Sequence, residues 1–215
     1  MLTNYKYDME KERFKKTFKL SESSIEKICN HINLLIKWQS KINLVSSGTL
    51  DNLWNRHIFD SAQIIRFLPS IKKDKIILDI GSGAGFPGLI LSAMGREDIF
   101  LCDSNQKKCT FLKEAFRNMV LREKVFSCRV EELNLNNVSV LISRAFSSIL
   151  NIFKSSFNII REETFMILLK GKSIEKELHE AKEEFHFNYQ KFPSITSTHG
   201  WVVIIKNIRK ISNND

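Results

Sequence analysis

Hydrophobic residues in the first third of the chain recur at the spacing of an α-helix. Ile25, Ile28, Ile32 and Leu35 lie three or four positions apart and predict an amphipathic helix from about residue 25 to residue 41. A second series of this kind predicts another helix over residues 50–68, ending before a proline. The first twenty residues mix basic and acidic side chains, and we expect them to form a frayed, charged lead-in.

From residue 76 onward, short apolar runs alternate with helical patterns. The predicted strands span residues 76–80, 99–103, 125–130, 138–142 and 165–169, and two late extended segments span residues 189–192 and 201–205. The predicted helices between them span residues 87–94, 107–119, 149–160 and 174–185. This alternation indicates a mostly parallel sheet, and the late strands indicate an antiparallel C-terminal hairpin at its edge. The sequence therefore predicts an α/β protein with an N-terminal helical extension.

The first predicted strand runs directly into a glycine-rich turn. Residues 76–80 form a short isoleucine-rich run that is typical of a strand buried on both faces of a parallel sheet. Gly81, Gly83, Gly85 and Gly88 follow, and glycine permits positive φ and close approach of the backbone to a ligand. A strand, a glycine turn and a helix in this order predict the first half of a nucleotide-binding unit, whose ligand lies outside the carboxyl ends of the strands.

Composition narrows the class of protein. With 215 residues, 43% of them hydrophobic, the chain can bury a sizeable core. We expect residues 1–70 to form the helical extension and residues 71–215 the main domain. The lack of a long apolar run argues against a membrane span, and the N-terminus lacks the apolar centre of a secretory signal. The four cysteines show no metal-ligand spacing, so we expect reduced thiols, no metal site and a cytoplasmic location.

The positive charge is concentrated before the glycine turn. The formal net charge is +9. Residues 1–75 hold 14 Lys and Arg against 8 Asp and Glu, a net +6, whereas residues 76–215 hold 19 against 16, a net +3. Such an excess fits either a solubilising bias towards lysine or a basic arm for nucleic acid.

Three ionisable residues, Asp79, Asp103 and Arg144, are expected at the carboxyl ends of strands. Asp103 follows Gly85 by 18 positions, close to the spacing of about 20 at which an acid accepts hydrogen bonds from ribose hydroxyls. This spacing suits a dinucleotide and S-adenosylmethionine equally. Asp79 separates them, because a carboxylate beside the turn repels the pyrophosphate of NAD and suits the cationic end of S-adenosylmethionine. Glu131, after the third strand, is either an adenine contact or a solvated loop acid.

Specific stretches then point to one family. The most specific are Arg56-His57-Ile58-Phe59-Asp60-Ser61 and the run from Asp79 to Gly88, which ends in Gly85-Phe86-Pro87-Gly88. Further matches lie in residues 43–46, 103–104, 129–132, 143–146, 169–171 and 202–206. In this order they resemble the RsmG family, also called GidB, the bacterial 16S rRNA guanine-N7-methyltransferases. The resemblance covers residues 25 to 206, although Phe86 stands where the family often has leucine.

The resemblance implies a class I, Rossmann-like methyltransferase that uses S-adenosylmethionine and releases S-adenosylhomocysteine. It implies cofactor contacts from Gly81, Phe86, Val130, Glu131 and Arg144. We add four residues to the expected cofactor site because they lie in the glycine turn or at the ends of strands: Asp79, Gly83, Gly85 and Asp103. The implied substrate is a guanosine of 16S rRNA, free or in an assembling 30S subunit, and we expect the protein to be a monomer.

Methyl transfer to guanine N7 demands little acid–base chemistry. N7 has a free lone pair and no proton, so we expect no catalytic base and no metal, only in-line positioning. Because an A-form major groove hides N7, the base must be splayed out or lie in an open loop, and Phe86 or Phe146 is a candidate to stack on it. The residues expected to contact RNA or substrate are Arg56, His57, Arg144, Phe146 and Lys170. A purely structural role is an equal alternative for His57 and for both phenylalanines.

The residues alone leave two other functions open, an NAD(P)-dependent oxidoreductase on a Rossmann fold and a non-catalytic rRNA-binding protein. Asp79 argues against the first, and the intact set of acids and glycines argues against the second. A basic helix face also has two interpretations, a solvated surface or a track for RNA phosphates. Its residues are Lys107, Lys108, Lys113 and Arg117.

Overall fold

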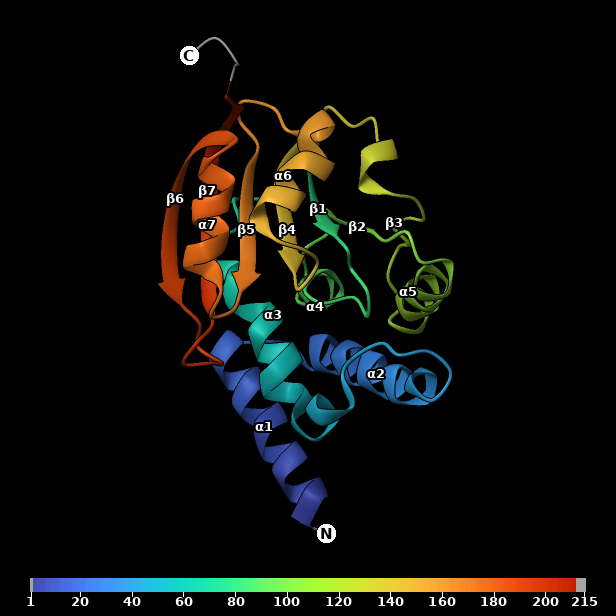
Figure 1. Ribbon diagram of the computed structural model, residues 1–215. Coiled ribbons are helices and arrows are strands. Elements are labelled where there is room, and N and C mark those ends of the chain that lie inside the picture. Colours follow the sequence, from blue (N-terminus) through green and yellow to red (C-terminus); the bar gives the residue numbers. More distant parts are fainter. Residues whose placement is uncertain (1, 212–215) are drawn as a thin grey trace.

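A mixed seven-stranded sheet forms the centre of the computed structural model, which describes the backbone of residues 2–211 and the side chains of residues 7–211 (Figure 1). The strand order is β3-β2-β1-β4-β5-β7-β6. The strands are β1 (Ile76–Ile80), β2 (Ile99–Cys102), β3 (Val125–Phe126), β4 (Val138–Arg144), β5 (Phe165–Lys170), β6 (Phe185–Pro193) and β7 (Trp201–Lys210). The first five pair in parallel, and β7 pairs antiparallel with both β5 and β6. The predicted α/β class and antiparallel edge are confirmed.

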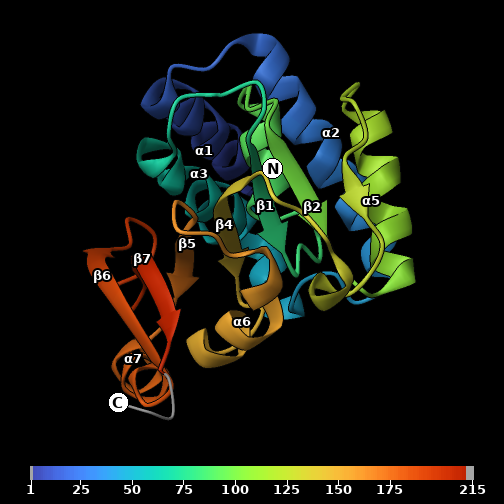
Figure 2. The ribbon, with the colours of Figure 1, turned by 90° about the horizontal axis from the view of Figure 1, so that it is seen from above.

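Helices cover both faces of the sheet, and each face has its own hydrophobic core (Figure 2). One core includes Leu78, Phe153 and Leu178 and lies under α6 and α7. The other includes Trp54 and Phe111 and lies under α4, α5 and the N-terminal helices. The α-helices are α1 (Leu2–Phe18), α2 (Glu22–Gln39), α3 (Asp60–Ala62), α4 (Gly88–Ala93), α5 (Gln106–Asn118), α6 (Ile149–Ser156) and α7 (Ile174–Lys182).

The expectation that the first twenty residues are frayed is wrong. Residues 2–18 form α1, and Phe14 on this helix is fully buried. Its ring lies 5.5 Å from that of Trp54 and 4.9 Å from that of Phe59, measured between centroids. Phe14 and Phe18, four positions apart, form an apolar stripe that the surrounding charges obscure in the sequence. Residue 1 and residues 212–215, at the ends of the two predicted domains, lie outside the described residues.

The two predicted N-terminal helices differ in regularity. The first is α2, which begins after Ser21, whose hydroxyl accepts a hydrogen bond from the Ser24 N–H at 3.1 Å. The segment over residues 50–68 is instead a succession of short turns of different pitch: η1 (Ser47–Asn52), η2 (Trp54–Phe59), α3 and η3 (Gln63–Phe67). The π-helical turn η2 carries Arg56 and His57. Such turns often occur at functional sites.

The order of the parallel strands reverses between β1 and β4, which are neighbours in the sheet. In folds of this kind the ligand crevice lies at this reversal, outside the carboxyl ends of the strands. The segments that follow β1 and β4, namely the glycine turn and residues 145–147, therefore meet there. The predicted third strand is shorter than expected, because Val130 already belongs to a 3₁₀ turn, η4 (Val130–Glu132). A further 3₁₀ turn, η5 (Phe157–Ile159), extends α6.

Candidate active site

A small cavity of about 330 Å³ opens outside the carboxyl ends of the parallel strands. Its lining includes Gly81 after β1, Asp103 after β2, Val130 and Glu131 in η4, and Phe146 after β4. The structure thus brings together four of the residues that the sequence assigned to a cofactor and one that it assigned to the substrate.

Asp103 fixes the shape of this small cavity. One carboxylate oxygen, Oδ2, accepts a hydrogen bond from the Gly83 N–H at 2.8 Å, and Oδ1 accepts one from the Asn105 N–H at 2.8 Å. The glycine turn and the start of α5 are therefore tied to one buried side chain. Each oxygen of an ionised carboxylate can accept a second hydrogen bond, so Asp103 retains the capacity to bind a diol.

Asp79 and Phe86 lie beneath the glycine turn, where both are buried. Asp79 Oδ2 accepts a hydrogen bond from the Gly88 N–H at 2.9 Å, and Oδ1 has no hydrogen-bond partner among the described residues. Burial raises the pKa of the Asp79 carboxyl to about 7, although the Gly88 N–H and the charge of Arg144 oppose the shift. From this position Asp79 acts on the turn through Gly88, whose missing Cβ would lie 2.7 Å from Oδ2.

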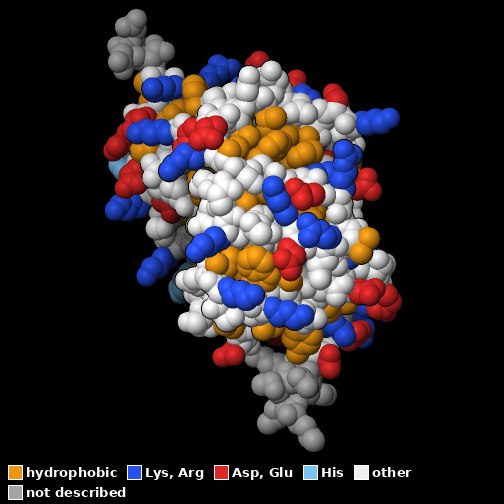
Figure 3. All heavy atoms as spheres, turned by 90° about the vertical axis from the view of Figure 1, so that its right-hand side faces the viewer, with side chains coloured by type: hydrophobic (Ala, Val, Ile, Leu, Met, Phe, Trp, Pro, Cys, Tyr) orange, Lys and Arg blue, Asp and Glu red, His pale blue; other side chains and the backbone are white. Residues whose placement is uncertain are grey.

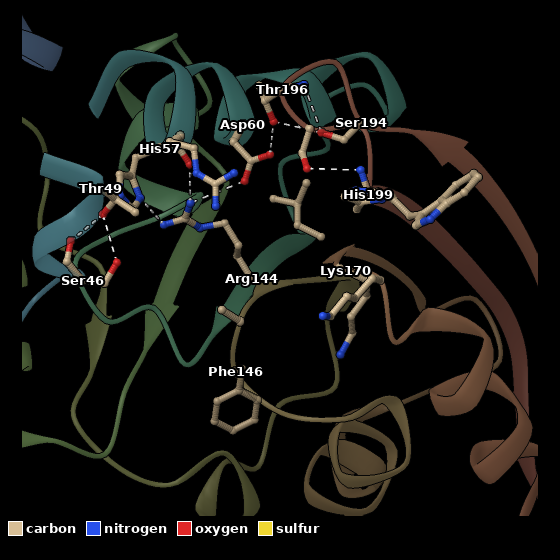
Figure 4. Close-up of a pocket in the computed structure, with 18 of the residues that line it drawn as sticks. Ser46, Thr49, His57, Asp60, Arg144, Phe146, Lys170, Ser194, Thr196 and His199 are labelled. Atoms are coloured by element: carbon tan, nitrogen blue, oxygen red, sulfur yellow. Dashed lines mark hydrogen bonds and ion pairs between the residues drawn. The ribbon is translucent and has the colours of Figure 1, made fainter. Parts of the chain in front are cut away.

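A large pocket of about 700 Å³, with lining residues shown in Figure 4, adjoins the small cavity. Ala145 and Phe146 line both spaces, so the two meet at these residues. The large pocket is built from four separate segments, within residues 44–60, 144–147, 169–177 and 194–201. Every residue that the sequence assigned to substrate contact is in its lining: Arg56, His57, Arg144, Phe146 and Lys170.

Arg144 is held by side chains and backbone of the N-terminal segment. Its Nη2 donates to His57 Nδ1 at 2.7 Å, and its Nη1 donates to the Arg56 carbonyl at 3.0 Å. Nη1 also lies 3.4 Å from Asp60 Oδ2, in an ion pair. The guanidinium lies 5.0 Å from the centroid of the Phe86 ring. The end of β4 is thereby joined to η2 and α3 (Figure 4).

His57 is a neutral orienting group in this arrangement. Because its Nδ1 accepts a hydrogen bond from Arg144, its Nε2 carries the hydrogen and donates to Thr49 Oγ1 at 2.8 Å. Burial, reinforced by the charge of Arg144, lowers the pKa of His57 to about 3. The imidazole also stacks on Phe86, with centroids 4.9 Å apart. Both nitrogens are engaged within the protein.

The other cationic side chains of the large pocket differ in whether they already form an ion pair with an acidic side chain. Lys170 donates to Glu177 Oε2 at 2.8 Å and to the Ser147 carbonyl, and its side chain is only 7% exposed. Arg56 and Lys172 also line the pocket, and the ion pairs of residues 7–211 include neither of them. These two cations therefore remain available to an anionic ligand.

The loop between β6 and β7, which no sequence motif marked as functional, supplies Ser194, Thr196 and His199 to the large pocket. Thr196 Oγ1 donates to Asp60 Oδ1 at 2.6 Å, linking residues 136 positions apart in the chain. In the sequence this loop reads only as a polar hairpin connection. The only feature that could have indicated a role for this loop is the position of its hairpin at the sheet edge. There β7 pairs with β5, whose last residue is Lys170.

The basic face of α5 is not a continuous positive surface. On the side of the molecule that carries α5, Lys and Arg side chains are interspersed with Asp and Glu (Figure 3). Lys113 lies 3.8 Å from Glu123, whereas Lys108 contributes to the lining of the small cavity. This mixture is typical of a solvated helix face.

Comparison with known proteins identifies the family. The family described as rRNA small subunit methyltransferase G matches residues 24–204. The chain belongs to this family. It is 39% identical over 193 residues to the ribosomal RNA small subunit methyltransferase G of Rickettsia prowazekii, covering 90% of this chain and 99% of that protein. The enzyme of the same name from Rhodospirillum rubrum is 34% identical over 202 residues, which cover 94% of this chain and all of that protein.

The fold agrees with membership of the methyltransferase G family. A solved SAM-dependent methyltransferase from Aquifex aeolicus superposes with a TM-score of 0.53 at 15% identity, covering 69% of this chain and 90% of that one. The predicted class I methyltransferase fold is confirmed, and the oxidoreductase and non-catalytic alternatives are not favoured. Within residues 2–211, no helix is long and apolar enough to cross a membrane.

Proposed function

We propose that this methyltransferase G family member transfers a methyl group from S-adenosylmethionine to N7 of a guanosine in 16S rRNA. One observation carries the proposal: the small cavity and the large pocket meet at Ala145 and Phe146, on the ligand side of the sheet. A cofactor in the first and a base in the second are then direct neighbours. Such an arrangement favours direct transfer between two bound groups.

The residues of the small cavity fit S-adenosylmethionine. Its volume of about 330 Å³ suits a nucleoside, and the carboxylate of Asp103 offers acceptors for the ribose hydroxyls. Val130 and Glu131 supply an apolar and a polar contact for adenine. We assign the methionine end to the space beside Gly81 and Arg144, with Asp79, Gly83, Gly85 and Phe86 holding the turn and its support in place.

The large pocket is the proposed site of the target guanosine. Arg56 and Lys172 provide unpaired positive charge for RNA phosphates, while Arg144 and Lys170 are held by Asp60 and Glu177. Phe146 offers an aromatic face at the boundary with the small cavity. A splayed nucleotide has both an apolar and an anionic part, and the lining contains counterparts for each.

In this reaction the residues of the two sites position the cofactor and the target base, and they transfer no proton. The bound cofactor supplies an activated methyl group, whose bond to sulfur breaks as the N7 lone pair forms the new N–C bond. N7 loses no proton, so the reaction needs no base, in agreement with a neutral His57 whose two nitrogens are engaged. Arg144, anchored by His57 and Asp60, has the fixed geometry that in-line transfer requires.

The deciding experiment is methyl transfer from labelled S-adenosylmethionine to purified 30S subunits and to naked 16S rRNA. Cleavage chemistry specific for 7-methylguanosine then maps the product. We expect one N7-methylated guanosine, with the better substrate showing whether ribosomal proteins take part. Incorporation at another atom or another RNA contradicts the proposal. We further expect a monomer that acts in the cytoplasm, which sedimentation and cell fractionation test.

A further inference from the structure

The ring of Phe146 covers Gly81 on the ligand side of the glycine turn. An ideal Cβ at Gly81 would lie 2.1 Å from Cδ2 of Phe146 and 2.6 Å from its Cγ. The aromatic side chain therefore occupies the space that a side chain at residue 81 would need. Gly81 also lines the small cavity, so the ring covers part of the proposed cofactor site itself.

Phe146 also lines three neighbouring cavities. It lines the small cavity, the large pocket and a third cavity of about 340 Å³ that includes Glu131 and Asn151. A methyl group passing directly from the small cavity to the large pocket has to pass between the two spaces at Ala145 and Phe146. Phe146 is 42% exposed, although residues with rings of this size are usually buried more deeply.

The chain on either side of Phe146 is anchored, whereas the ring is not. Arg144 is fixed by His57 and Asp60, and the Ser147 carbonyl accepts a hydrogen bond from Lys170. Between these anchors, Ala145 has a φ of +53°, a conformation that residues other than glycine adopt rarely. Phe146 can therefore change its position while the hydrogen bonds of its neighbours stay intact.

We propose that cofactor binding displaces Phe146 from Gly81 and turns the ring into the platform on which the target guanine stacks. The inference rests on the proposed function and adds an order to it, with the cofactor binding before the base. When N7 accepts the methyl group, the positive charge that was on sulfur moves to the base. The face of an aromatic ring attracts such a cationic base, so the released Phe146 favours transfer as well as binding.

Three variants test this proposal: Phe146→Ala removes the ring, Phe146→Tyr keeps it, and Phe157→Ala is the matched control. Phe157 is also 42% exposed, but it lies on η5 and packs against Phe185. The affinity for S-adenosylhomocysteine is measured by calorimetry, and methylation of 30S subunits is measured as kcat/KM. Circular dichroism and thermal unfolding establish that each variant is folded.

We expect Phe146→Ala to bind S-adenosylhomocysteine about three- to tenfold more tightly, because the covering ring reduces the fraction of competent molecules. Its kcat/KM should fall roughly five- to hundredfold, the range for loss of a base–aromatic stack. Phe157→Ala should resemble the wild type in both measurements, and Phe146→Tyr, which keeps the ring, should depart from the wild type less than Phe146→Ala does. A ring with a merely structural role cannot produce tighter binding together with slower transfer.

Two results overturn the inference: cofactor-product affinity that does not rise in Phe146→Ala, and methylation that does not fall. Failure of the proposed function looks different, because the wild type would then bind S-adenosylhomocysteine without methylating 30S subunits. In that case the affinities of Phe146→Ala and the wild type still decide whether the ring covers the cofactor site.

Discussion

The small cavity and the large pocket adjoin at Phe146, yet they are built in opposite ways. The small cavity is formed by the segments that directly follow parallel strands, and its residues lie between Gly81 and Phe146. The large pocket needs η2, the end of β4, the end of β5 and the β6–β7 loop. Its central hydrogen bond, between Thr196 and Asp60, spans 136 positions. A site built from successive loops is local in the sequence, whereas the large pocket exists only in the folded protein.

The two sites differ in their charges as well. Asp103 holds backbone N–H groups in the small cavity, so its negative charge shapes the turn. In the large pocket, Asp60 and Glu177 hold the cations Arg144 and Lys170 in fixed positions. Groups fixed in this way need no reorganisation when a substrate binds. Variants that affect one site and spare the other test whether the two are separate.

The largest effect is expected for Asp60→Ala, which removes the carboxylate shared by Arg144 and Thr196. It should lower the free energy of unfolding by about 2–3 kcal/mol, less than the 3–5 kcal/mol for a fully buried pair. The reduction is smaller because the two side chains of the ion pair are 17% and 20% exposed. Urea unfolding and methylation assays measure the loss. Binding of 5′-methylthioadenosine, which lacks the amino-acid part of the cofactor, should persist because it needs only the small cavity.

Asp51→Ala is the control for Asp60→Ala, because Asp51 is an exposed acid on the neighbouring turn η1. It should leave unfolding, methylation and 5′-methylthioadenosine binding unchanged. If Asp60→Ala abolishes 5′-methylthioadenosine binding in a folded protein, the two sites are not separate.

Asp103→Ala should have the converse effect. Loss of this carboxylate releases the Gly83 and Asn105 N–H groups and removes the proposed ribose acceptor. We expect affinity for 5′-methylthioadenosine and S-adenosylhomocysteine to fall by about 1–3 kcal/mol, the range for a charged hydrogen bond. Calorimetry measures both affinities. The control is Glu132→Ala, because Glu132 is an exposed acid in η4. Unchanged affinity removes Asp103 from the site.

A third prediction concerns His31 under the turn and His57 in the large pocket. Burial lowers the pKa of His31 to about 4, and burial with Arg144 lowers that of His57 to about 3. Both values lie below the ordinary value near 6.5, so below pH 6.5 the unfolded chain takes up protons that the folded protein does not. The stability that these two neutral histidines contribute is therefore fully present above pH 6.5 and falls as the pH decreases towards 4 and 3.

Each histidine should contribute at most about 1.4 kcal/mol per pH unit to this acid loss of stability. His31→Leu and His57→Asn should therefore show a shallower dependence between pH 7.5 and pH 5 in urea unfolding. His31→Leu should do so without impairing the large pocket, because its two ring nitrogens have no hydrogen-bond partner among the described residues. Parallel curves for variants and wild type contradict the lowered pKa values.

The smallest effect is expected for Lys172→Ala in the large pocket. Loss of one phosphate contact should weaken rRNA binding by less than about 1 kcal/mol and reduce the slope of log affinity against log salt by about 0.7. Filter binding at several salt concentrations measures it, and S-adenosylhomocysteine affinity should not change. Lys73→Ala, an exposed lysine before β1, is the matched control. Equal slopes for both variants exclude Lys172 from the RNA-binding surface.

The difference between the two sites also explains which features the sequence could predict. The isoleucine run of β1, the glycines after it and Asp103 are close in the chain, and each has a strong local signal. The periodicity of α2 was equally readable. The prediction of a frayed segment over the first twenty residues was wrong because α1 is stabilised by packing of Phe14 on Trp54. The charged sequence does not reveal this tertiary contact.

Within the site, residue identity was easier to predict than residue role. Arg144 and Lys170 were expected to contact RNA or substrate, but the partners that hold them, Asp60 and Glu177, became visible only in three dimensions. The burial of Phe86 under His57 likewise depends on how η2 packs over the turn. No local pattern indicated that Thr196 would reach Asp60.

The position of β7 has a consequence for synthesis on the ribosome. This strand is made last but lies between β5 and β6, so β6 emerges before the neighbour with which it pairs. The β6–β7 loop, which contacts Asp60, leads directly into β7, the strand that pairs with β5. All residues of the small cavity emerge before this loop. A growing chain therefore completes the proposed cofactor cavity before the proposed RNA pocket.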